Sequence, residues 1–366
     1  MKLKILFILH YPPPVHGAAM VGQYIRESEK INNAFAGRYI NLGTSRTIDE
    51  IGKGGLKKWW RYIILLFKSG ISVLSFRPNL VYLTLTSKGV GFFKDALVAI
   101  IAKVLGAKIV YHFHNKGVST RQDKCLDNLL YKIVFKNADV ILLSKHLYPD
   151  IQKYVPKNRV HICPNGIPEM VQDSKFKIQK EKSKSVEILF LSNLIVSKGV
   201  YVLLKACEIL KEKGLVFHCT YVGGEGDISE EQLQQNIKKS GLTTYVKYAG
   251  KKYGIEKSVL FRQADIFVLP TNNDIFGLVN LEAMQFSLPV VSTFEGGIPD
   301  VVEDGQTGFL VPKNDAIAVA EKLELLIKDP VLRKEMGELG KEKYKAKFTL
   351  AAFETRFTVI LKELAK

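Results

Sequence analysis

The order of short apolar runs constrains the fold of this chain more than any other feature. Runs that are apolar at successive positions are typical of strands buried on both faces of a parallel sheet. In the first half they alternate with helical patterns near 18–30, 56–75, 91–104 and 123–137. The strands predicted there cover 4–9 (KILFIL), 80–85 (LVYLTL), 108–113, 139–144 and 159–164.

The alternation stops at a polar, lysine-rich segment and then starts again. Residues 174–185 (SKFKIQKEKSKS) are typical of an exposed linker. Beyond it, strands are predicted over 186–192, 215–223, 265–270, 289–293 and 308–312, with helices between them. Two βαβ series joined by a linker predict an α/β chain with two doubly wound, Rossmann-like parallel sheets. We expect domains at 1–170 and 186–348, a linker at 171–185, and a last helix (349–366) that could cross back to the first domain.

The composition describes a folded protein with one strongly basic half. An apolar fraction of 47% is typical of a globular chain, and no apolar run reaches the ~18 residues that span a membrane. Residues 1–185 contain 30 Lys and Arg against 12 Asp and Glu, and residues 186–366 contain 23 against 24, so the net charge of +17 belongs to the first half. Solubility alone explains the sign of this charge but not its one-sidedness. The first half is therefore expected to attract an anionic partner, such as a membrane face, a phosphate-bearing substrate or nucleic acid.

The four cysteines are widely spaced and form no C-x-x-C pair. This spacing predicts a reducing compartment, here the cytoplasm, with neither a disulfide framework nor a zinc site.

Ligands of doubly wound sheets bind beyond the carboxyl ends of the strands, so the loops after strands are the candidate sites. Loop 10–20 (HYPPPVHGAAM) places Gly17 at a helix start, where a ligand can approach the backbone, although a tight turn explains one glycine equally well. His112 and His114 share one face at the end of strand 108–113. His114 lies nearer the strand end and is the better candidate to reach the cleft that two facing sheets would form. The alternative is a structural hydrogen-bonding role.

In the second half, Lys198 and Gly199 are predicted to begin a helix directly after a strand. A cation is disfavoured at that end of a helix, so Lys198 is a candidate to hold a diphosphate together with helix amides, with a solvated lysine as the alternative. The glycines of 221–227 (YVGGEGD) indicate close packing or ligand approach, and Gly296-Gly297 adds another such loop.

The stretch NDIFGLVNLEAM (273–284) places Asp274 before a predicted helix and Glu282 two turns into it. Free amides at the helix start are expected to bind phosphate oxygens. Carboxylates beside a phosphate site are costly unless they accept bonds from hydroxyls, so a nucleotide sugar fits: the amides bind its diphosphate and each acid binds one ring. A plain helix cap is the alternative for Asp274, but it does not account for Glu282. The amides expected to be free are those of Ile275, Phe276, Gly277 and Leu278.

Taken together, these motifs resemble those of the retaining glycosyltransferases of family four, which have the GT-B fold. The resemblance covers nearly the whole chain and is strongest over 186–312, where SKG, ADIFVLPT, a D-x7-E spacing into EAM, PVVST…GGIPD and DGQTGFLV follow in family order. It implies two Rossmann-like domains facing a cleft, with 1–170 on the acceptor side and 186–348 binding the nucleotide sugar.

The resemblance also implies roles for matching positions. Lys198 would hold the donor diphosphate, and Glu282 would bind the ribose hydroxyls. Asp274, where the family usually has Glu, and His114 would contact the transferred sugar. The expected catalytic residues are therefore His114, Asp274 and Lys198, and the expected substrate-binding residues are Gly17, Asn193, Ile275, Phe276, Gly277, Leu278 and Glu282.

Two further expectations concern phosphate binding. Asn193 stands where an arginine commonly partners the lysine in the family, so the diphosphate is expected to depend on Lys198 and backbone amides. No D-x-D motif is present, which agrees with metal-free GT-B chemistry. No cofactor and no metal ligand are therefore expected.

The implied activity is transfer of a hexose, with retention, from a nucleotide sugar that we expect to be UDP-linked. The expected acceptor is a glycan or a lipid-pyrophosphate-linked glycan in bacterial surface-polysaccharide synthesis. Alternatives are a GT-B epimerase or phosphorylase, a non-catalytic scaffold, and a nucleic-acid-binding protein suggested by charge alone. Because no basic-aromatic module is recognisable, we expect no nucleic-acid partner.

One helical stripe in the first half mixes aromatic, aliphatic and basic residues. The segment LKKWWRYIILLF (56–67) fits a core helix of the first sheet, and it also fits a helix lying in a membrane interface. Because the charge is one-sided, we expect peripheral contact with an anionic membrane surface, on the inner face of the plasma membrane. The apolar stripe consists of Leu56, Trp59, Trp60, Ile63, Ile64 and Phe67, beside Lys57, Lys58 and Arg61.

Overall fold

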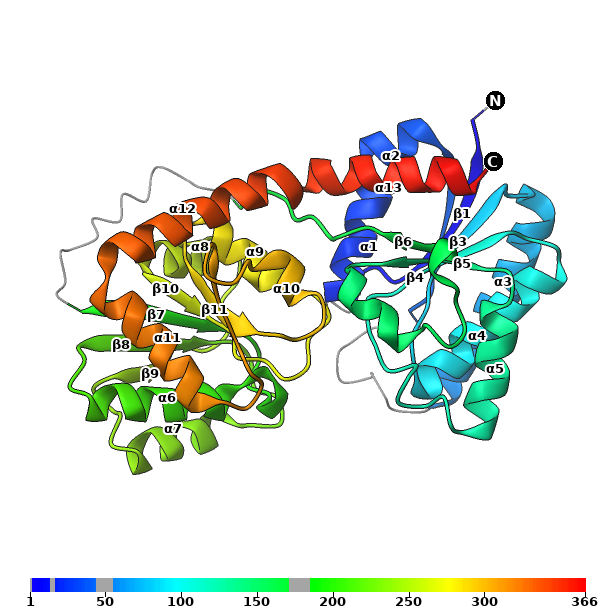
Figure 1. The fold of residues 1–366 in the computed structure, drawn as a ribbon. Coiled ribbons are helices and arrows are strands. Elements are labelled where there is room, and N and C mark those ends of the chain that lie inside the picture. Colours follow the sequence, from blue (N-terminus) through cyan, green and yellow to red (C-terminus); the bar gives the residue numbers. More distant parts are fainter. Residues whose placement is uncertain (1, 14–16, 44–54, 171–184) are drawn as a thin grey trace. The chain divides into compact units, whose positions relative to one another are not determined.

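A computed structural model describes residues 2–13, 17–43, 55–170 and 185–366 (Figure 1). The chain divides into two units: unit 1 is Met1–Gly166 with Leu350–Lys366, and unit 2 is Ile167–Thr349. Each unit contains a six-stranded parallel sheet covered by helices, as the α/β prediction requires. Most of the predicted linker, 171–184, lies outside the described residues.

In unit 1 the strand order is β2-β1-β3-β4-β5-β6. The strands are β1 (Lys4–Leu9), β2 (Ala36–Asn41), β3 (Leu80–Thr84), β4 (Ile109–His112), β5 (Asp139–Leu142) and β6 (Val160–Ile162). Its helices are α1 (Gly17–Glu27), α2 (Glu29–Ala34), α3 (Leu56–Phe76), α4 (Gly89–Val104), α5 (Cys125–Phe135) and α13 (Leu350–Leu364). The connections through α3, α4 and α5 all run in the same direction across the sheet, so right-handed crossovers place these three helices on one face. The connection through α1 and α2 runs the other way, and α13 packs beside α2.

In unit 2 the strand order is β12-β11-β10-β7-β8-β9. The strands are β7 (Val186–Leu191), β8 (Phe217–Val222), β9 (Val246–Tyr248), β10 (Ile266–Val268), β11 (Val290–Thr293) and β12 (Gly308–Val311). The helices are α6 (Val200–Glu212), α7 (Glu230–Lys239), α8 (Gly254–Gln263), α9 (Leu278–Gln285), α10 (Ile298–Val301), α11 (Ala316–Lys328) and α12 (Pro330–Lys347). The chain builds outward from β7 in one direction, then returns and builds from β10 in the other. The order therefore reverses between the paired strands β7 and β10.

The predicted strands are confirmed to within about two residues at their ends. The sequence missed β2 and β9, which lie at sheet edges and contain only one buried residue each. Because most residues of these two strands are at least partly exposed, neither strand shows a continuous apolar run. The single helix predicted at 18–30 is two helices, because Ser28 accepts a hydrogen bond from the amide of Ile31 and begins a second one.

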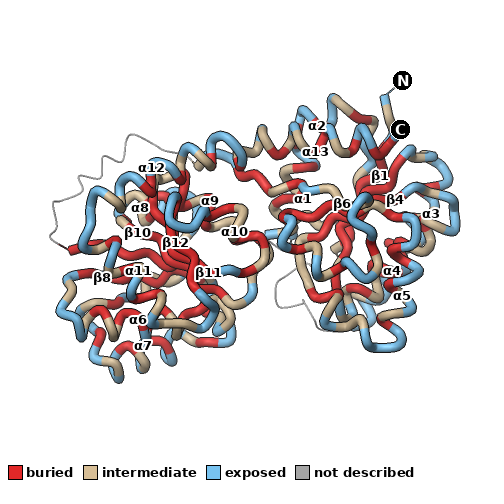
Figure 2. Tube along the Cα trace, viewed as in Figure 1, coloured by how far each residue is buried: buried red, intermediate tan, exposed pale blue. Residues whose placement is uncertain are grey.

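The core-helix interpretation of the stripe at 56–67 is wrong for most of its residues. The sheets form the buried centre of each unit (Figure 2), but α3 turns its largest side chains outward. Trp59 and Trp60 are 65% and 66% exposed, and only Ile63 of the stripe is partly buried. The exposed members are Leu56, Trp59, Trp60, Ile64 and Phe67. Among the described helices, none is both long and apolar enough to cross a membrane.

Candidate functional site

The point where the strand order of unit 2 reverses brings two predicted loops together. The loop after β7 (192–199) and the loop after β10 (269–277) leave neighbouring parallel strands at the same edge of the sheet. The helices that follow go to opposite faces, and this divergence is where doubly wound sheets bind ligands. Lys198 and Asp274, 76 positions apart in the sequence, meet here.

The two loops are fastened by backbone contacts that require glycine. Gly199 has a φ of 84°, and a side chain at this position would collide with the carbonyl of Pro270. The carbonyl of Ser197 accepts hydrogen bonds from the amide of Asn272 at 2.7 Å and from the hydroxyl of Thr271 at 3.1 Å. Lys198 lies between Ser197 and Gly199, so its backbone position is fixed on both sides.

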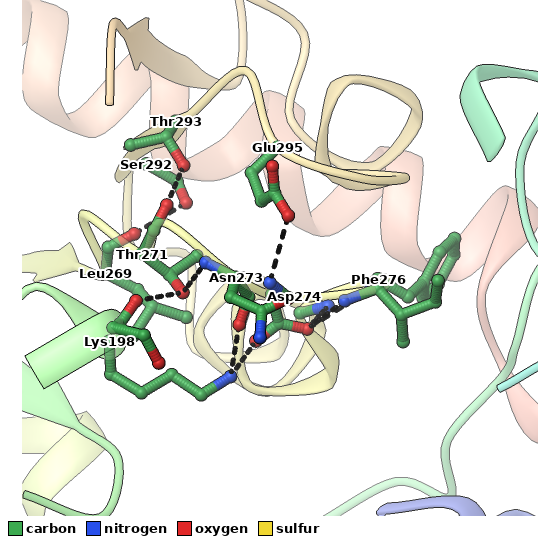
Figure 3. A network of polar contacts seen from close by, with 12 residues as sticks. Lys198, Leu269, Thr271, Asn273, Asp274, Phe276, Ser292, Thr293 and Glu295 are labelled. Atoms are coloured by element: carbon green, nitrogen blue, oxygen red, sulfur yellow. Dashed lines mark hydrogen bonds and ion pairs between the residues drawn. The ribbon is translucent and has the colours of Figure 1, made fainter. Parts of the chain in front are cut away.

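The side chain of Lys198 reaches across to the turn that contains Asp274 (Figure 3). Its Nζ lies 2.7 Å from Oδ2 of Asp274 and donates to the carbonyl of Asn273 at 3.2 Å. Lys198 ends a short 3-10 turn (Val196–Lys198), and α6 begins at Val200. Helix α6 therefore begins two residues later than predicted, because the left-handed Gly199 separates the 3-10 turn from the helix.

Asp274 is held as a carboxylate. Burial by itself would raise its pKa, but the charge and hydrogen bond of Lys198, with the amides of Gly277 and Phe276, outweigh burial and hold the pKa below its usual range. Lys198 and Asp274 are thus an ion pair at neutral pH. From the sequence, Lys198 and Asp274 were expected to contact the phosphate and the sugar separately. In the fold, the two side chains contact each other.

Three of the four amides that were predicted to be free before α9 already donate hydrogen bonds. Oδ1 of Asp274 accepts hydrogen bonds from the amides of Ile275 at 2.8 Å, Phe276 at 3.2 Å and Gly277 at 2.9 Å. As the capping alternative proposes, the Asp274 side chain accepts hydrogen bonds from the backbone amides that follow it. These amides belong to the turn before α9, whose first residue is Leu278. The prediction failed because a short carboxylate reaches the amides that follow it more easily than an external phosphate does. The Phe276 side chain is fully buried against Phe348.

A third loop, after β11, lies on the Asp274 turn. Glu295 is only 2% exposed, accepts a hydrogen bond from the amide of Asp274 at 3.3 Å and pairs with Nζ of Lys313 at 2.9 Å. Gly296 has a φ of 55°, and a side chain there would collide with the carbonyl of Asp274. Sequence reasoning missed Glu295 and Lys313. The available signal was an acid placed directly between a buried strand and a glycine pair.

Glu282 lies on α9 and faces α8. Its Oε2 lies 2.5 Å from Nζ of Lys257, and both side chains are about one-fifth exposed. This is an ion pair by distance, yet Oε2 is enclosed and makes no hydrogen bond of acceptable angle within the described residues. Glu282 therefore keeps capacity to accept hydroxyl donors. Lys257 was not predicted, because nothing in the sequence of α8 marks it as a partner of α9.

Asn193 connects two loops of unit 2. Its Oδ1 accepts a hydrogen bond from the amide of Gly224 at 3.2 Å, and its side chain is exposed. A side chain at Gly223 would collide with the carbonyl of Ser192. Of the two interpretations of the YVGGEGD loop, close packing is thus the one the geometry explains.

In unit 1 the two histidines touch, as their shared strand face predicts. The rings of His112 and His114 are 4.1 Å apart, and Nδ1 of His112 lies 2.7 Å from the hydroxyl of Tyr82. Burial, and then the charge of His114, lower the pKa of His112 well below its usual value, so His112 is neutral. His114 lies one residue beyond buried Phe113 and is partly exposed.

The chain that follows His114 is anchored by a residue that the sequence did not reveal. Asp150 accepts hydrogen bonds from the amides of Gly117 at 2.8 Å, Val118 at 3.1 Å and Ser119 at 3.0 Å. Gly17 is the exposed first residue of α1, and residues 14–16 before it lie outside the described residues. Among the side chains the structure describes, no group of three or more His, Cys, Asp or Glu is arranged to hold a metal ion.

Comparison with known proteins gives this geometry a context. Residues 171–343 match the family model of glycosyl transferases group 1. The amylovoran biosynthesis glycosyltransferase AmsK of Erwinia amylovora is 32% identical over 60% of this chain and 54% of its own length. The capsular polysaccharide biosynthesis glycosyltransferase CapM of Staphylococcus aureus is 27% identical over 64% of this chain and 65% of its own length. The match thus spans only about half to two-thirds of these relatives.

Solved structures match over the whole length. A glycosyltransferase from Rickettsia africae superposes with a TM-score of 0.76 at 18% identity, covering 100% of this chain and 99% of that one. Anabaena Alr3699/HepE, solved in complex with UDP-glucose, gives a TM-score of 0.74 at 19% identity, covering 99% and 100%. At these identities the likeness concerns the fold. The chain has the GT-B fold, and its residues 171–343 are similar to the glycosyl transferases group 1 family.

Proposed function

We propose that the protein is a retaining glycosyltransferase that transfers a sugar from a UDP-linked donor to a glycan acceptor in surface-polysaccharide synthesis. The observation that carries this proposal is the ion pair of Lys198 and Asp274 at the point where the strand order of unit 2 reverses. The names of AmsK and CapM support the polysaccharide setting, and the UDP-glucose complex of HepE supports the donor class.

Lys198 is proposed to bind the diphosphate of the donor. Its ammonium carries three N–H donors, and within the described residues two of them are engaged by Asn273 and Asp274. The third is available to a phosphate oxygen. Because the two existing bonds fix the ammonium in place, it is preorganised to stabilise charge that develops on the leaving group.

Asp274 is proposed to accept a hydroxyl of the transferred sugar. Oδ1 already accepts three amides and Oδ2 accepts Lys198, so one lone pair of Oδ2 remains. Glu282 is proposed to accept the ribose hydroxyls, with Lys257 holding its carboxylate in place. Because Asp274 is one methylene shorter than the Glu usual in the family, we expect it to influence which sugar is used.

In the proposed reaction, the bond between C1 of the sugar and the diphosphate oxygen breaks, and both electrons go to that oxygen. The acceptor hydroxyl oxygen forms the new bond to C1 on the same face, and its proton goes to the leaving phosphate oxygen. Lys198 stabilises the departing diphosphate, so we propose that no metal cofactor is required. The roles of His114 and Gly17 stay predictions from the resemblance, as does a lipid-pyrophosphate-linked acceptor.

The proposal is tested first by donor binding. A thermal-shift screen against nucleotide sugars is expected to show stabilisation by UDP-sugars, because a ligand stabilises the fold that binds it. Nucleotide release is then measured with and without a glycan acceptor. Release that requires acceptor supports transfer, and release or epimerisation without acceptor contradicts it. An absence of any nucleotide binding would also contradict it.

A further inference from the structure

Helix α3 buries Tyr62, Leu65 and Val73, but it presents most of its bulky apolar residues to solvent. The inward face includes Ser69 and Ser72, which are only 1% and 6% exposed. A helix that covers a sheet in water normally shows the opposite pattern. The outward stripe, spaced three or four residues apart, consists of Leu56, Trp60, Ile64, Phe67, Ile71 and Leu74, each at least half exposed.

The two neighbouring helices extend this surface. Helix α3 packs on α4, and α4 packs on α5, on the same face of the sheet. Val90, Leu97 and Val104 lie seven residues apart along α4 and are exposed. On α5 the exposed apolar residues are Leu126, Leu129 and Ile133. We call the outer surface of α3, α4 and α5 the three-helix face.

The charges on the three-helix face are of one sign. The three helices contain two acidic residues, Asp95 and Asp127, and these are buried at 3% and 2% exposure. Their basic residues are Lys57, Lys58, Arg61, Lys68, Lys94, Lys103 and Lys132. Unit 1 as a whole contains 28 Lys and Arg against 11 Asp and Glu, whereas unit 2 contains 25 against 25, so the net charge of +17 lies in unit 1.

We propose that the three-helix face docks on the surface of an anionic lipid bilayer, with α3 lying in the interface. Tryptophan side chains favour the headgroup level, and aliphatic side chains favour the acyl boundary below it. Each Lys or Arg near an anionic bilayer adds electrostatic attraction. A second copy of this chain is a poorer occupant, because it would bring two faces of the same strong positive charge together. This inference does not depend on the proposed transfer activity.

Intrinsic tryptophan fluorescence reports directly on this docking. Trp59 and Trp60 are the only tryptophans in the sequence, and both are exposed on α3. Addition of vesicles of phosphatidylcholine with 30% phosphatidylglycerol to the full-length protein should shift tryptophan emission to the blue. Brominated acyl chains should quench it. Binding to pure phosphatidylcholine vesicles should be at least about tenfold weaker, because these vesicles carry no net charge. Binding to the anionic vesicles should weaken by a similar factor at high salt, because salt screens exposed charges.

Variants distinguish binding through the three-helix face from non-specific adsorption of exposed apolar residues to vesicles. The triple variant Trp60→Ser, Ile64→Ser, Phe67→Ser should lower binding to the anionic vesicles about tenfold or more in co-sedimentation, with thermal unfolding essentially unchanged because the residues are exposed. The matched control is Ile317→Ser, Leu325→Ser, Val331→Ser, which removes equally exposed apolar residues from helices of unit 2 and should leave vesicle binding unchanged.

The charge contribution is tested separately. Lys57→Glu with Lys68→Glu should weaken binding to anionic vesicles and flatten its dependence on salt. Unchanged binding in both the serine and the glutamate variants would overturn the proposal. So would light scattering that shows the wild type as a dimer without lipid, the serine variant as a monomer, and vesicle binding equal in both, because the face would then be occupied by a second copy.

Discussion

The outer helices of the two units differ in the residues that they turn towards solvent. Both units cover a six-stranded parallel sheet with helices. In unit 2, helix α7 follows the usual rule for water: it buries Leu233 and Ile237, begins with acids and ends with lysines. In unit 1, α3 buries two serines beside Tyr62, Leu65 and Val73, and it exposes both tryptophans. The sheet specifies where a helix lies, and we propose that the medium outside the helix specifies which residues face outward.

The carboxyl edges of the two sheets differ as well. In unit 2 the edge is crosslinked by charged pairs, Lys198 with Asp274 and Lys313 with Glu295. In unit 1 it is built around neutral, buried His112 and the backbone bonds to Asp150. A preorganised charge suits an anionic leaving group, so under the proposed function we expect the phosphate chemistry in unit 2.

The largest expected effect comes from removing the cation at the edge of unit 2. Lys198→Ala should lower the turnover of nucleotide sugar about 10²–10³-fold, as expected for loss of one preorganised group at developing charge. The measurement is the steady-state turnover of wild type and variant with a UDP-sugar that the wild type uses. Lys205→Ala is the matched control, since Lys205 is an exposed lysine of α6 paired with Glu208, and it should keep full turnover. Equal turnover in wild type and Lys198→Ala would remove the assignment to unit 2.

The second prediction concerns the turn that Asp274 holds. Asp274→Ala leaves three amides and Lys198 without their acceptor, and should lower the free energy of unfolding by about 3 kcal/mol. The control is Asp315→Ala, which removes a cap that accepts one amide and should cost about 1 kcal/mol. Denaturant unfolding distinguishes the two. Similar losses would mean that the Asp274 turn adds no rigidity beyond an ordinary cap.

The third prediction separates the units by pH. Burial, and then the charge of Lys94, lower the pKa of His10 in unit 1 from 6.5 to about 4. The unfolded chain then binds a proton that the folded chain does not, so stability falls as pH decreases from 6.5 towards 4, by up to about 3 kcal/mol. The pKa of Asp274 in unit 2 is lowered, so its contribution is complete above the usual aspartate pKa and is lost at more acidic pH. On acidification, amide hydrogen exchange should therefore become faster in peptides of unit 1 at a higher pH than in peptides of unit 2. His10→Gln should reduce this difference in pH between the two units. Simultaneous loosening, unaffected by His10→Gln, would contradict this order.

The smallest expected effects test the inner serines and the exposed apolar stripe of α3. Ser69 has a buried hydroxyl with no hydrogen-bond partner among the described residues, so Ser69→Ala should change the free energy of unfolding by about 1 kcal/mol or less, towards greater stability. Trp60→Ala on the outer face should be neutral within about 0.5 kcal/mol in lipid-free buffer. A large loss from Trp60→Ala would show that the outer stripe is part of the core after all.

Much of the fold could be predicted because its signals are local. The buried strands, the glycine loops after them and the helix that contains Glu282 were all visible as periodicity and spacing in the sequence. Lys198 and Asp274 were found by the same means, each from the loop in which it lies. The edge strands β2 and β9 were missed because a half-exposed strand carries only half of the apolar pattern.

The partners of the candidate residues could not be predicted in this way. That Lys198 pairs with Asp274, and Glu282 with Lys257, depends on which strands and helices become neighbours. The amides before α9 looked free because the sequence does not show that the Asp274 carboxylate turns back onto them.

The sequence by itself determined two wound sheets, a basic first half and the loops in which the chemistry should lie. Tertiary structure alone decided which charges meet and which side of α3 faces the solvent. The physical reason is range: hydrophobic periodicity is encoded in consecutive residues, whereas an ion pair between residues 76 positions apart exists only after β7 and β10 have paired.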